Sequence, residues 1–229
     1  MSSMHLDRVS EAILEAILRM HAPLAGTEQR LSLALYRLLA AGEAVSAEAL
    51  AHAAGVERGQ AEIAISGWPA VYRDAGDRVI GYWGLTIAPT RHRMLITGKQ
   101  LYAWCAWDTL FLPELLETAA HVESVCPVTG ARIALEVGPD GVGAEGERPL
   151  VSFVAPDPQK AAEDVVANFC HFVHFFATEQ AGRRWTLEHP AAILATLDEA
   201  WEFGRRRNAR YYPGKPLSSG AHPPRSASR

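Results

Sequence analysis

The chain has 229 residues, 48% of them hydrophobic, and a formal net charge of -4 at pH 7. The length fits one large domain or two small ones, and the composition is sufficient for a hydrophobic core. A net negative charge provides no general attraction to nucleic acid or to an anionic membrane, so we expect neither as a partner. The sequence has no run of about 18 apolar residues, so we expect no transmembrane helix.

The N-terminal segment is not typical of a signal peptide, because Glu11 and Glu15 interrupt the apolar run that such a peptide needs. We therefore expect a cytoplasmic protein. In this reducing compartment the three cysteines of the chain are expected to be free and chemically active. Their odd number also argues against a framework made only of disulfides.

The first third of the chain is predicted to consist of helices followed by a β-hairpin. The predicted helices cover residues 7–20, 27–41, 46–55 and 57–66. Thr27 is the expected N-cap of the second helix, and Ser46 and Gly55 are expected to begin and end the third. Residues 71–83 then predict a hairpin with its turn near residues 74–77.

Helices followed by a hairpin are the layout of a winged-helix module, which we assign to residues 1–84. A DNA-binding module needs a basic recognition helix, because its partner is a polyanion. The candidate segment, residues 43–67, is acidic instead, with Glu43, Glu48, Glu57 and Glu62 against the single arginine Arg58. We therefore interpret the module as a structural cap on the rest of the chain.

Residues 85–210 differ in character and predict a mixture of strands and helices. Expected strands cover residues 93–97, 121–125, 131–137, 149–154 and 169–176, and expected helical segments cover residues 101–116, 161–166 and 191–207. Pro113 is expected to bend or interrupt its helix, and residues 138–147 to form a polar, glycine-rich loop. Residues 211–229 are rich in Pro, Gly and Ser and predict a flexible tail, which follows a solvated basic stretch at residues 205–210.

The most informative feature is a thiol and a carboxyl three residues apart at residues 101–110, with the sequence Leu-Tyr-Ala-Trp-Cys-Ala-Trp-Asp-Thr-Leu. If this segment is helical, Cys105 and Asp108 share one face. A thiol is a good nucleophile or metal ligand only as thiolate, and a neighbouring carboxylate can take its proton and later deliver it elsewhere. A core cysteine beside an exposed aspartate is the alternative that residue chemistry leaves open. The aromatic residues of the segment, Tyr102, Trp104 and Trp107, are expected to be pocket walls or core.

The second candidate segment is the apolar run at residues 168–176, Asn-Phe-Cys-His-Phe-Val-His-Phe-Phe, which predicts a buried strand. On a strand, Cys170 and His174 would point to one face and His171 to the other. Cys170 and Cys105 are therefore candidates to meet across a core. A zinc site of Cys170, His171 and His174 is an alternative, but opposite strand faces weaken it, and satisfied core histidines are the simpler interpretation.

Three segments together resemble the organomercurial lyase (alkylmercury lyase) family. They are Leu-Tyr-Ala-Trp-Cys-Ala-x-Asp-Thr-Leu at residues 101–110, Cys-Pro-Val-Thr-Gly at residues 126–130 and Phe-Cys-His-Phe-Val-His-Phe-Phe at residues 169–176. The similarity runs in register from about Gly81 to about Trp185. This family cleaves carbon–mercury bonds in bacterial mercury resistance. The resemblance implies an α+β fold, in which the winged-helix-like N-terminal module precedes a catalytic domain of antiparallel strands and helices.

The resemblance implies that Cys105, Asp108 and Cys170 are the catalytic residues and that they also hold the mercury of substrate or product. It implies protonolysis of alkyl- and arylmercury compounds to a hydrocarbon and Hg(II), without a cofactor. Small cellular thiols and a mercuric reductase are the implied acceptors of Hg(II). Cys126 is implied to be a structural thiol, with a third mercury ligand as the alternative. Many family members have a second cysteine where this chain has His171, a difference that concerns only auxiliary thiol exchange.

Two other functions fit parts of the sequence. A mercury- or metal-sensing regulator would bind DNA through the winged helix and use the cysteines as sensor ligands, but the acidic helix argues against it. A passive metal-binding protein, or a different thiol enzyme, would need only the cysteines. Asp108 argues against passive binding, because a carboxylate is a poor ligand for a soft metal beside thiolates.

Overall fold

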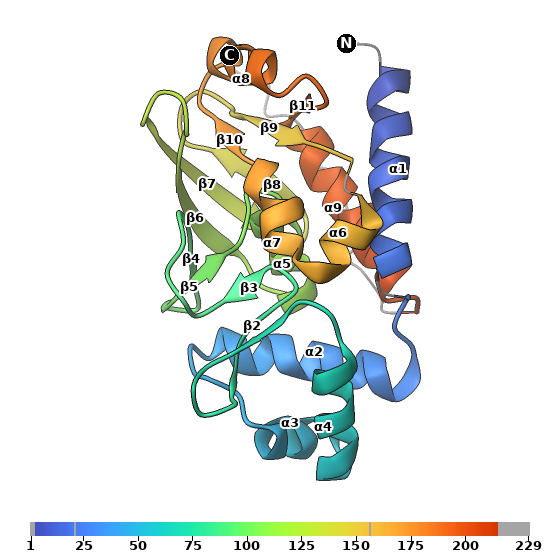
Figure 1. Ribbon diagram of the computed structural model, residues 1–229. Coiled ribbons are helices and arrows are strands. Elements are labelled where there is room, and N and C mark those ends of the chain that lie inside the picture. Colours follow the sequence, from blue (N-terminus) through green and yellow to red (C-terminus); the bar gives the residue numbers. More distant parts are fainter. Residues whose placement is uncertain (1–2, 21, 156, 215–229) are drawn as a thin grey trace.

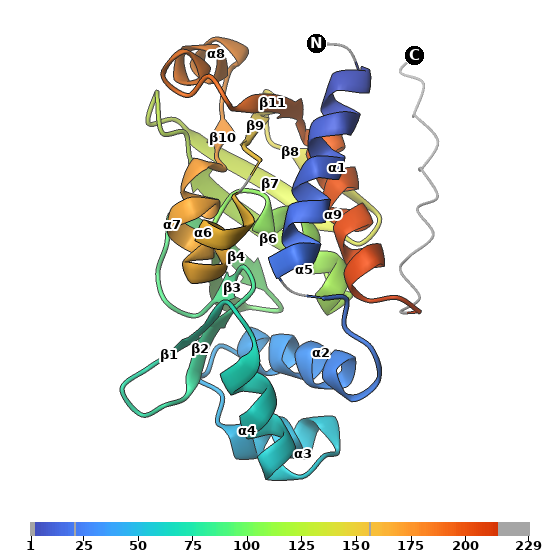
Figure 2. The ribbon, with the colours of Figure 1, turned by 45° about the vertical axis from the view of Figure 1, so that its right-hand side comes forward.

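The architecture of the chain is α+β, with helices packed on antiparallel sheets (Figure 1). The structure is a computed structural model that describes residues 3–20, 22–155 and 157–214. The fold class expected from the sequence is confirmed. Helix α1 (Ser3–Met20), which the sequence also predicts, runs alongside the C-terminal helix α9 (Leu197–Tyr211) (Figure 1, Figure 2).

One end of the molecule contains the helices and the hairpin that the first third of the sequence predicts (Figure 2). These elements are α2 (Gly26–Ala40), α3 (Ala47–Ala54), α4 (Arg58–Gly67), β1 (Val71–Arg73) and β2 (Val79–Tyr82). The Ser46 side chain accepts a hydrogen bond from a backbone amide three residues on (3.1 Å), and Gly55 ends α3 with φ 65°. Thr27 is not the N-cap of α2, because the helix begins one residue earlier, and its hydroxyl accepts a hydrogen bond from Arg30 instead.

An eight-stranded antiparallel sheet continues from this hairpin, in the order β1-β2-β3-β5-β4-β6-β7-β8. Its further strands are β3 (Leu85–Thr86), β4 (His92–Ile96), β5 (Lys99–Ala103), β6 (Ala120–Val125), β7 (Arg132–Gly138) and β8 (Gly141–Ala144). The pairing of β6 with β7 confirms the two strands predicted around residues 126–130. The loop expected at residues 138–147 is wrong in part, because β8 pairs with β7 inside it. The sheet continues across residue 84, because β3 pairs with both β2 and β5. The assignment of residues 1–84 as a winged-helix module stays a prediction.

A smaller three-stranded sheet, in the order β10-β9-β11, completes the other end. Its strands are β9 (Leu150–Phe153), β10 (Phe175–Phe176) and β11 (Ile193–Thr196), and the helices near it are α6 (Pro158–Glu163), α7 (Val165–Asn168) and α8 (Glu179–Glu188). The helix expected over residues 191–207 starts late, because residues 193–196 pair with β9. The capping box of Thr196 and Glu199 then starts α9.

The strand expected over residues 169–176 is wrong. Only its last two residues pair with β9, and Cys170–Phe172 forms a 3-10 turn after α7. The hydrophobic run contributes Phe169, Cys170, Val173, Phe175 and Phe176 to the core. The apolar composition of this run therefore reflects its burial and does not show that it pairs as a strand. In a short apolar run, periodicity does not distinguish a strand from another buried segment.

Helix α5 (Asp108–Leu116) packs against α9. The helix expected over residues 101–116 is wrong in its first part, because residues 101–103 belong to β5 and pair with β3 and β4. Pro113 lies inside α5 without ending it. Gly204 lets α9 approach α5 closely, since a Cβ at this position would lie 2.9 Å from the Cβ of Phe111.

The end of the described chain is well packed. Tyr211 and Tyr212, at the start of the predicted tail, are buried, and residues 215–229 of that tail lie outside the described residues. The basic stretch at residues 205–210 is not the solvated end expected, because Arg207 is buried and its neighbours pair with glutamates. Among the described helices, none has the length and apolar character needed to cross a membrane.

Candidate active site

Cys105 lies in a tight turn between β5 and α5 and is fully buried. Two backbone hydrogen bonds hold this turn. The Trp104 amide donates to the Gly84 carbonyl (3.0 Å), and the Ala106 amide donates to the Val173 carbonyl (3.2 Å). Both acceptors belong to segments far away in the sequence, so tertiary contacts rather than a local helix place the thiol.

Asp108 is the first residue of α5, and its carboxylate turns back toward Cys105. Its Oδ2 accepts a hydrogen bond from the Cys105 backbone amide at 2.8 Å. Asp108 lies in the first turn of α5, where the positive end of the helix dipole favours a carboxylate. The two residues are neighbours, as expected, although they do not share a helix.

Cys170 begins the 3-10 turn that follows α7. Its thiol, the Cys105 thiol and the Asp108 carboxylate offer donor atoms that all lie within 4.8 Å of one another, and all three residues are buried. The Val173 amide donates to the Cys170 carbonyl (3.1 Å), while the Val173 carbonyl accepts from Ala106. One residue therefore ties the two thiol-bearing turns together. Cys105 and Cys170 meet, as the sequence predicted, although neither lies on the predicted element.

Burial controls the protonation of this cluster. It raises the pKa of Asp108 to about 6, while hydrogen bonds from Cys105 and the charge of Arg207 lower that pKa in part. Burial also raises the pKa of the Cys105 thiol well above its usual value, and Cys170 and Asp108 add to this effect. A hydrogen bond with Cys105 lowers the pKa of Cys170, but burial and the Asp108 charge outweigh it, so that pKa is raised as well. Near neutral pH the resting cluster therefore holds two protonated thiols and one carboxylate.

The pocket at Asp108 and Cys170 is narrow and aromatic. Its other lining residues are Trp83, Gly84, Trp104, Trp107, Phe111, Val165, Phe169 and Arg207. Its free volume is about 20 Å³, which is room for about one water molecule. Trp104 and Trp107 are pocket walls, as predicted. This lining excludes water and suits an apolar organic group.

Two residues of the pocket were not expected from the sequence. Gly84 has φ +97°, and a Cβ there would lie 2.6 Å from the Asp108 carboxyl group, so a side chain at this position displaces the carboxylate. Arg207 is buried in the pocket wall. A glycine directly after a strand is a weak sequence signal, and nothing in the sequence separates Arg207 from the arginines beside it.

Comparison with known proteins shows the family to which the chain belongs. Residues 85–207 match the alkylmercury lyase (MerB) family model. The alkylmercury lyase of Staphylococcus epidermidis is 38% identical over 185 residues, which cover 80% of this chain and 84% of that protein. The chain belongs to the alkylmercury lyase family. The alkylmercury lyase of Streptomyces lividans is 41% identical over 172 residues, which cover 75% of this chain and 78% of the relative.

The fold of this family member is also found among solved structures. The crystal structure of the mercury-bound form of MerB2 superimposes with a TM-score of 0.68 and 23% sequence identity. The match covers 89% of this chain and 97% of that chain. Cys105, Asp108 and Cys170 all lie within residues 85–207, the part that the family model matches.

Other candidate donors of this alkylmercury lyase lie outside the cluster. Among the described residues, Cys105, Asp108 and Cys170 form the only group of at least three His, Cys, Asp or Glu side chains close enough to share a metal ion. The structure therefore does not bring Cys170, His171 and His174 together as a zinc site. Cys126 is likewise not part of this group, and its interpretation as a structural thiol stays a prediction.

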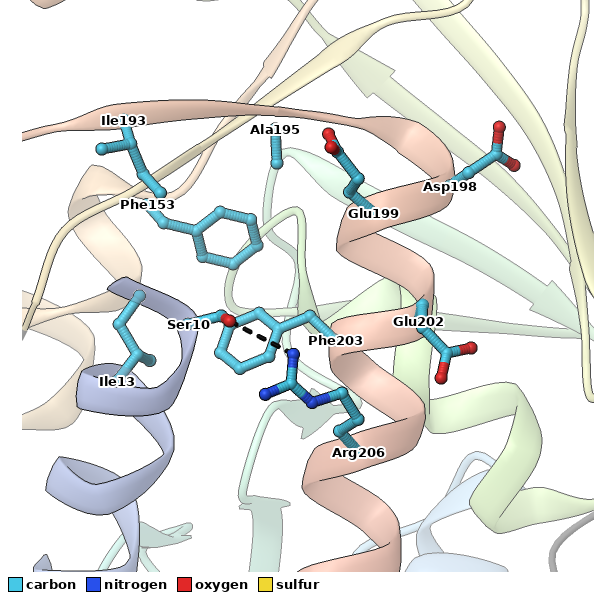
Figure 3. Close-up of a pocket in the computed structure, with 10 residues that line it drawn as sticks. All are labelled: Ser10, Ile13, Phe153, Ile193, Ala195, Asp198, Glu199, Glu202, Phe203 and Arg206. Carbon is cyan, nitrogen blue, oxygen red and sulfur yellow. Dashed lines mark hydrogen bonds between the residues drawn. The ribbon is translucent and has the colours of Figure 1, made fainter. Parts of the chain in front are cut away.

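A larger cavity of about 290 Å³ lies between α1 and α9 of the alkylmercury lyase (Figure 3). It is lined by Ser10, Ile13, Phe153, Ile193, Ala195, Asp198, Glu199, Glu202, Phe203 and Arg206, and no cysteine is among these residues. Phe203 stacks on Trp107 with the ring centroids 4.4 Å apart, so these rings stand between the cavity and the thiol pocket. Without a soft donor, the larger cavity is not a site for mercury.

Proposed function

We propose that Cys105, Asp108 and Cys170 cleave the carbon–mercury bond of alkyl- and arylmercury compounds, with a hydrocarbon and Hg(II) as products. This is the organomercurial lyase activity, a step of mercury detoxification, that membership of the family gives to the chain. The observation that most directly supports the residue roles is the cluster of two buried thiols and one buried carboxyl within 4.8 Å. Thiolates bind a soft metal and a carboxyl transfers protons, and protonolysis of this bond needs both.

In the first step Asp108 is the base and Cys105 the nucleophile. The substrate is R–Hg–X, where X is the anionic ligand that an organomercury cation carries in water. Asp108 takes the Cys105 proton, the thiolate forms a sulfur–mercury bond, and the mercury–X bond breaks. The proton leaves with X as HX. Asp108 is then a carboxylate again and is ready for a second proton.

In the second step Cys170 adds the second sulfur, and its proton passes to Asp108. Two thiolates donate electron density to mercury and weaken its bond to carbon. Asp108 is now the acid and protonates the carbon, and the electron pair of the carbon–mercury bond becomes the carbon–hydrogen bond. The hydrocarbon departs, and mercury stays Hg(II) between Cys105 and Cys170, so no redox step occurs.

The aromatic pocket wall supports this chemistry. Rings that exclude water raise the pKa of Asp108 toward neutrality, where one group serves well as both base and acid. A dry site also prevents water from taking up the proton that must reach carbon. The free volume of about 20 Å³ is too small for a phenyl group, so we expect the aromatic wall to move apart when an arylmercurial binds.

Release of Hg(II) requires other thiols, because two sulfur ligands bind it tightly. Thiol exchange passes the ion from one thiolate pair to another through a mixed intermediate. We infer that small cellular thiols, or the thiols of a mercuric reductase, accept it. Both acceptors fit the reducing cytoplasm that we expect for this protein.

The value of kcat/KM is expected to rise with pH and to level off above about pH 6. This parameter reports the ionisation of the free protein, and the first step needs Asp108 as carboxylate, with its pKa of about 6. The measurement is kcat/KM for phenylmercury at constant ionic strength between about pH 5 and pH 8. A flat profile across pH 6 would remove Asp108 as the base.

The raised pKa of Asp108 also affects stability. Its contribution to the free energy of unfolding falls as the pH rises, whereas kcat/KM is expected to rise. The pKa of Asp108 in the folded protein is raised above its ordinary value of 3.8, so its contribution to stability is fully present below pH 3.8 and is lost as the pH rises through about 6. Replacing Asp108 with Asn should therefore raise the free energy of unfolding at pH 8, by on the order of 2–3 kcal/mol, and should raise it far less at pH 4. Urea titrations of both proteins at the two pH values test the sign.

Gly84→Ala is expected to lower activity more than stability. The new Cβ would meet the Asp108 carboxyl at 2.6 Å, and a displacement of about 1 Å at a reacting group costs roughly 100-fold in rate. The positive φ should destabilise the protein by about 1–3 kcal/mol. Gly98→Ala is the matched control, because Gly98 has φ +79° with nothing within 4 Å of a Cβ. Equal loss of hydrocarbon release in both variants would contradict the role of Gly84.

Headspace gas chromatography tests the proposed function directly. Reduced protein receives phenylmercury or methylmercury with excess small thiol, and benzene or methane is counted per protein molecule. Several turnovers are the expected result. Mercury bound without any hydrocarbon would instead indicate a binder or a sensor, and duplex-binding measurements on the full chain would then distinguish these two.

A further inference from the structure

Arg207 is a buried cation on α9 that lies among aromatic rings. Its guanidinium carbon lies 4.4 Å from the centre of the Phe111 ring and 4.6 Å from that of Tyr211, and the residue is only 2% exposed. Its Nη1 donates to the Asn208 side-chain oxygen at 3.0 Å. Its Nη2 is buried and has no hydrogen-bond partner among the described residues.

The other arginines of this stretch are paired with carboxylates. Arg205 pairs with Glu114 at 3.3 Å, Arg210 pairs with Glu11 at 2.7 Å, and Arg206 pairs with Glu11 and also donates to Ser10 (Figure 3). Arg207 has no such pair with any side chain that the structure describes. A buried charge without a counter-ion costs several kcal/mol, so this residue needs a balancing charge from elsewhere.

The titratable groups around Arg207 leave one source for that charge. Tyr36, Tyr211 and Tyr212 face the guanidinium, and burial raises the pKa of each phenol above its usual value, so they are neutral. Glu114 approaches through Asn208, but Arg205 already pairs with it. The remaining charge is that of the reacting cluster, because Arg207 lines the same pocket as Asp108 and Cys170.

The charge of the cluster is constant through the proposed reaction. At rest, two neutral thiols and one carboxylate carry one negative charge. After the first step, the Cys105–mercury–R group is neutral and Asp108 is again a carboxylate. With Cys170 bound, two thiolates and R–Hg⁺ carry one negative charge beside a neutral carboxylic acid. After the hydrocarbon leaves, Hg(II) neutralises both thiolates and the carboxylate again carries the charge.

We propose that Arg207 is the fixed counter-ion of the reacting cluster and balances its single negative charge in every state of the cycle. This inference rests on the proposed function. A preorganised charge in a dry pocket needs no rearrangement as the negative charge moves from carboxylate to the sulfur–mercury group and back. Arg207 therefore helps to keep the negative charge, and with it the carboxylate base, in the cluster near neutral pH without having to touch the transferred proton.

The test compares Arg207→Met with Arg207→Lys and with the matched control Arg206→Met. Arg206 is the adjacent residue on the same helix, but it faces the larger cavity and Ser10 (Figure 3). The measurements are kcat/KM for phenylmercury and the melting temperature at pH 7. Arg207→Met should lower kcat/KM by roughly 100-fold per folded molecule, and the melting temperature shows whether the assayed protein is folded. Arg207→Lys should recover part of the rate, and Arg206→Met should keep it.

A purely structural role gives a different rate per folded molecule. Arg207→Met would then lose stability, and its remaining folded protein would keep the wild-type rate, which overturns the proposal. If Arg207→Met does not fold, the comparison of Arg207→Lys with Arg207→Gln decides, because only the lysine restores a charge, and equal rates overturn the proposal. Failure of the proposed function is distinguishable, since the wild-type protein itself would then release no hydrocarbon.

Discussion

Asp108→Asn is expected to bind one organomercurial per chain and to release almost no hydrocarbon. The amide is close in shape to the carboxyl and still offers an oxygen to the Cys105 backbone amide, which donates to Asp108 at 2.8 Å. It does not carry a proton from sulfur to carbon. Loss of a general acid–base group typically costs about 10²–10⁴-fold. Benzene release by headspace chromatography and bound mercury by mass spectrometry measure the two steps separately.

A second buried carboxylate provides the control for Asp108. Glu114 lies on the same helix, is 2% exposed, and pairs with Arg205 rather than with a thiol. Glu114→Gln should lose stability, because it weakens a partly buried ion pair, and should keep hydrocarbon release per folded molecule. Wild-type release from Asp108→Asn would show that the proton reaches carbon by another route and would remove Asp108 from the mechanism.

Cys105→Ser and Cys170→Ser are each expected to abolish turnover. A hydroxyl has nearly the shape of a thiol but is a poor ligand for a soft metal and does not ionise near neutral pH. Each variant keeps one thiol, so it should still capture R–Hg⁺ in the pocket. With one sulfur the carbon–mercury bond is not weakened enough for protonation. The expected result is a stable protein–mercurial adduct in the mass spectrum and no hydrocarbon in the headspace.

Cys126→Ser is the matched control for both thiols. The Cys126 thiol is buried in the turn at residues 126–130 and lies outside the cluster. Burial raises its pKa, but hydrogen bonds from Thr129 and from the Ala177 backbone outweigh burial and lower it. The variant should lose stability more than chemistry. Turnover by Cys105→Ser or Cys170→Ser close to that of Cys126→Ser would exclude the substituted thiol from the reaction.

Much of the peripheral structure follows from local sequence. Ser46 and Gly55 begin and end α3 as predicted, because side-chain capping and a left-handed C-terminal glycine act within one helical turn. The hairpin of β1 and β2 and the strands β6 and β7 also lie where turn residues and alternation place them. These signals depend on neighbours in the chain, so a single sequence is sufficient to reveal them.

The identity of the proposed reacting residues was also inferred from the sequence. A thiol and a carboxyl three residues apart, and a second thiol in an aromatic run, indicate proton transfer next to a soft ligand. Their resemblance to a known family then selects Cys105, Asp108 and Cys170 from the other cysteines, histidines and acids. The chemistry could be inferred in this way because it depends on residue type more than on backbone geometry.

The geometry of the site depends on contacts between distant segments. Residues 101–103 have a composition that permits a helix, but pairing with β3 and β4 makes them a strand. The 3-10 turn at Cys170 contacts the Cys105 turn through hydrogen bonds of the Val173 backbone. The two turns are far apart in the sequence. Local propensity is a weak preference of less than about 1 kcal/mol per residue, and such tertiary contacts override it.

The electrostatic setting of the site has the same origin. Sequence places Arg207 in a basic run that is expected to be solvated, and it places Gly84 directly after the predicted hairpin, without evident function. Only the packing of α9 against α5 buries Arg207 in the pocket wall, and only the turn before β3 brings Gly84 against Asp108. Sequence by itself therefore determined which side chains are the candidates for the reaction. The tertiary structure decided their spacing, their burial and the charge around them, because these depend on which distant segments exclude water from the same pocket.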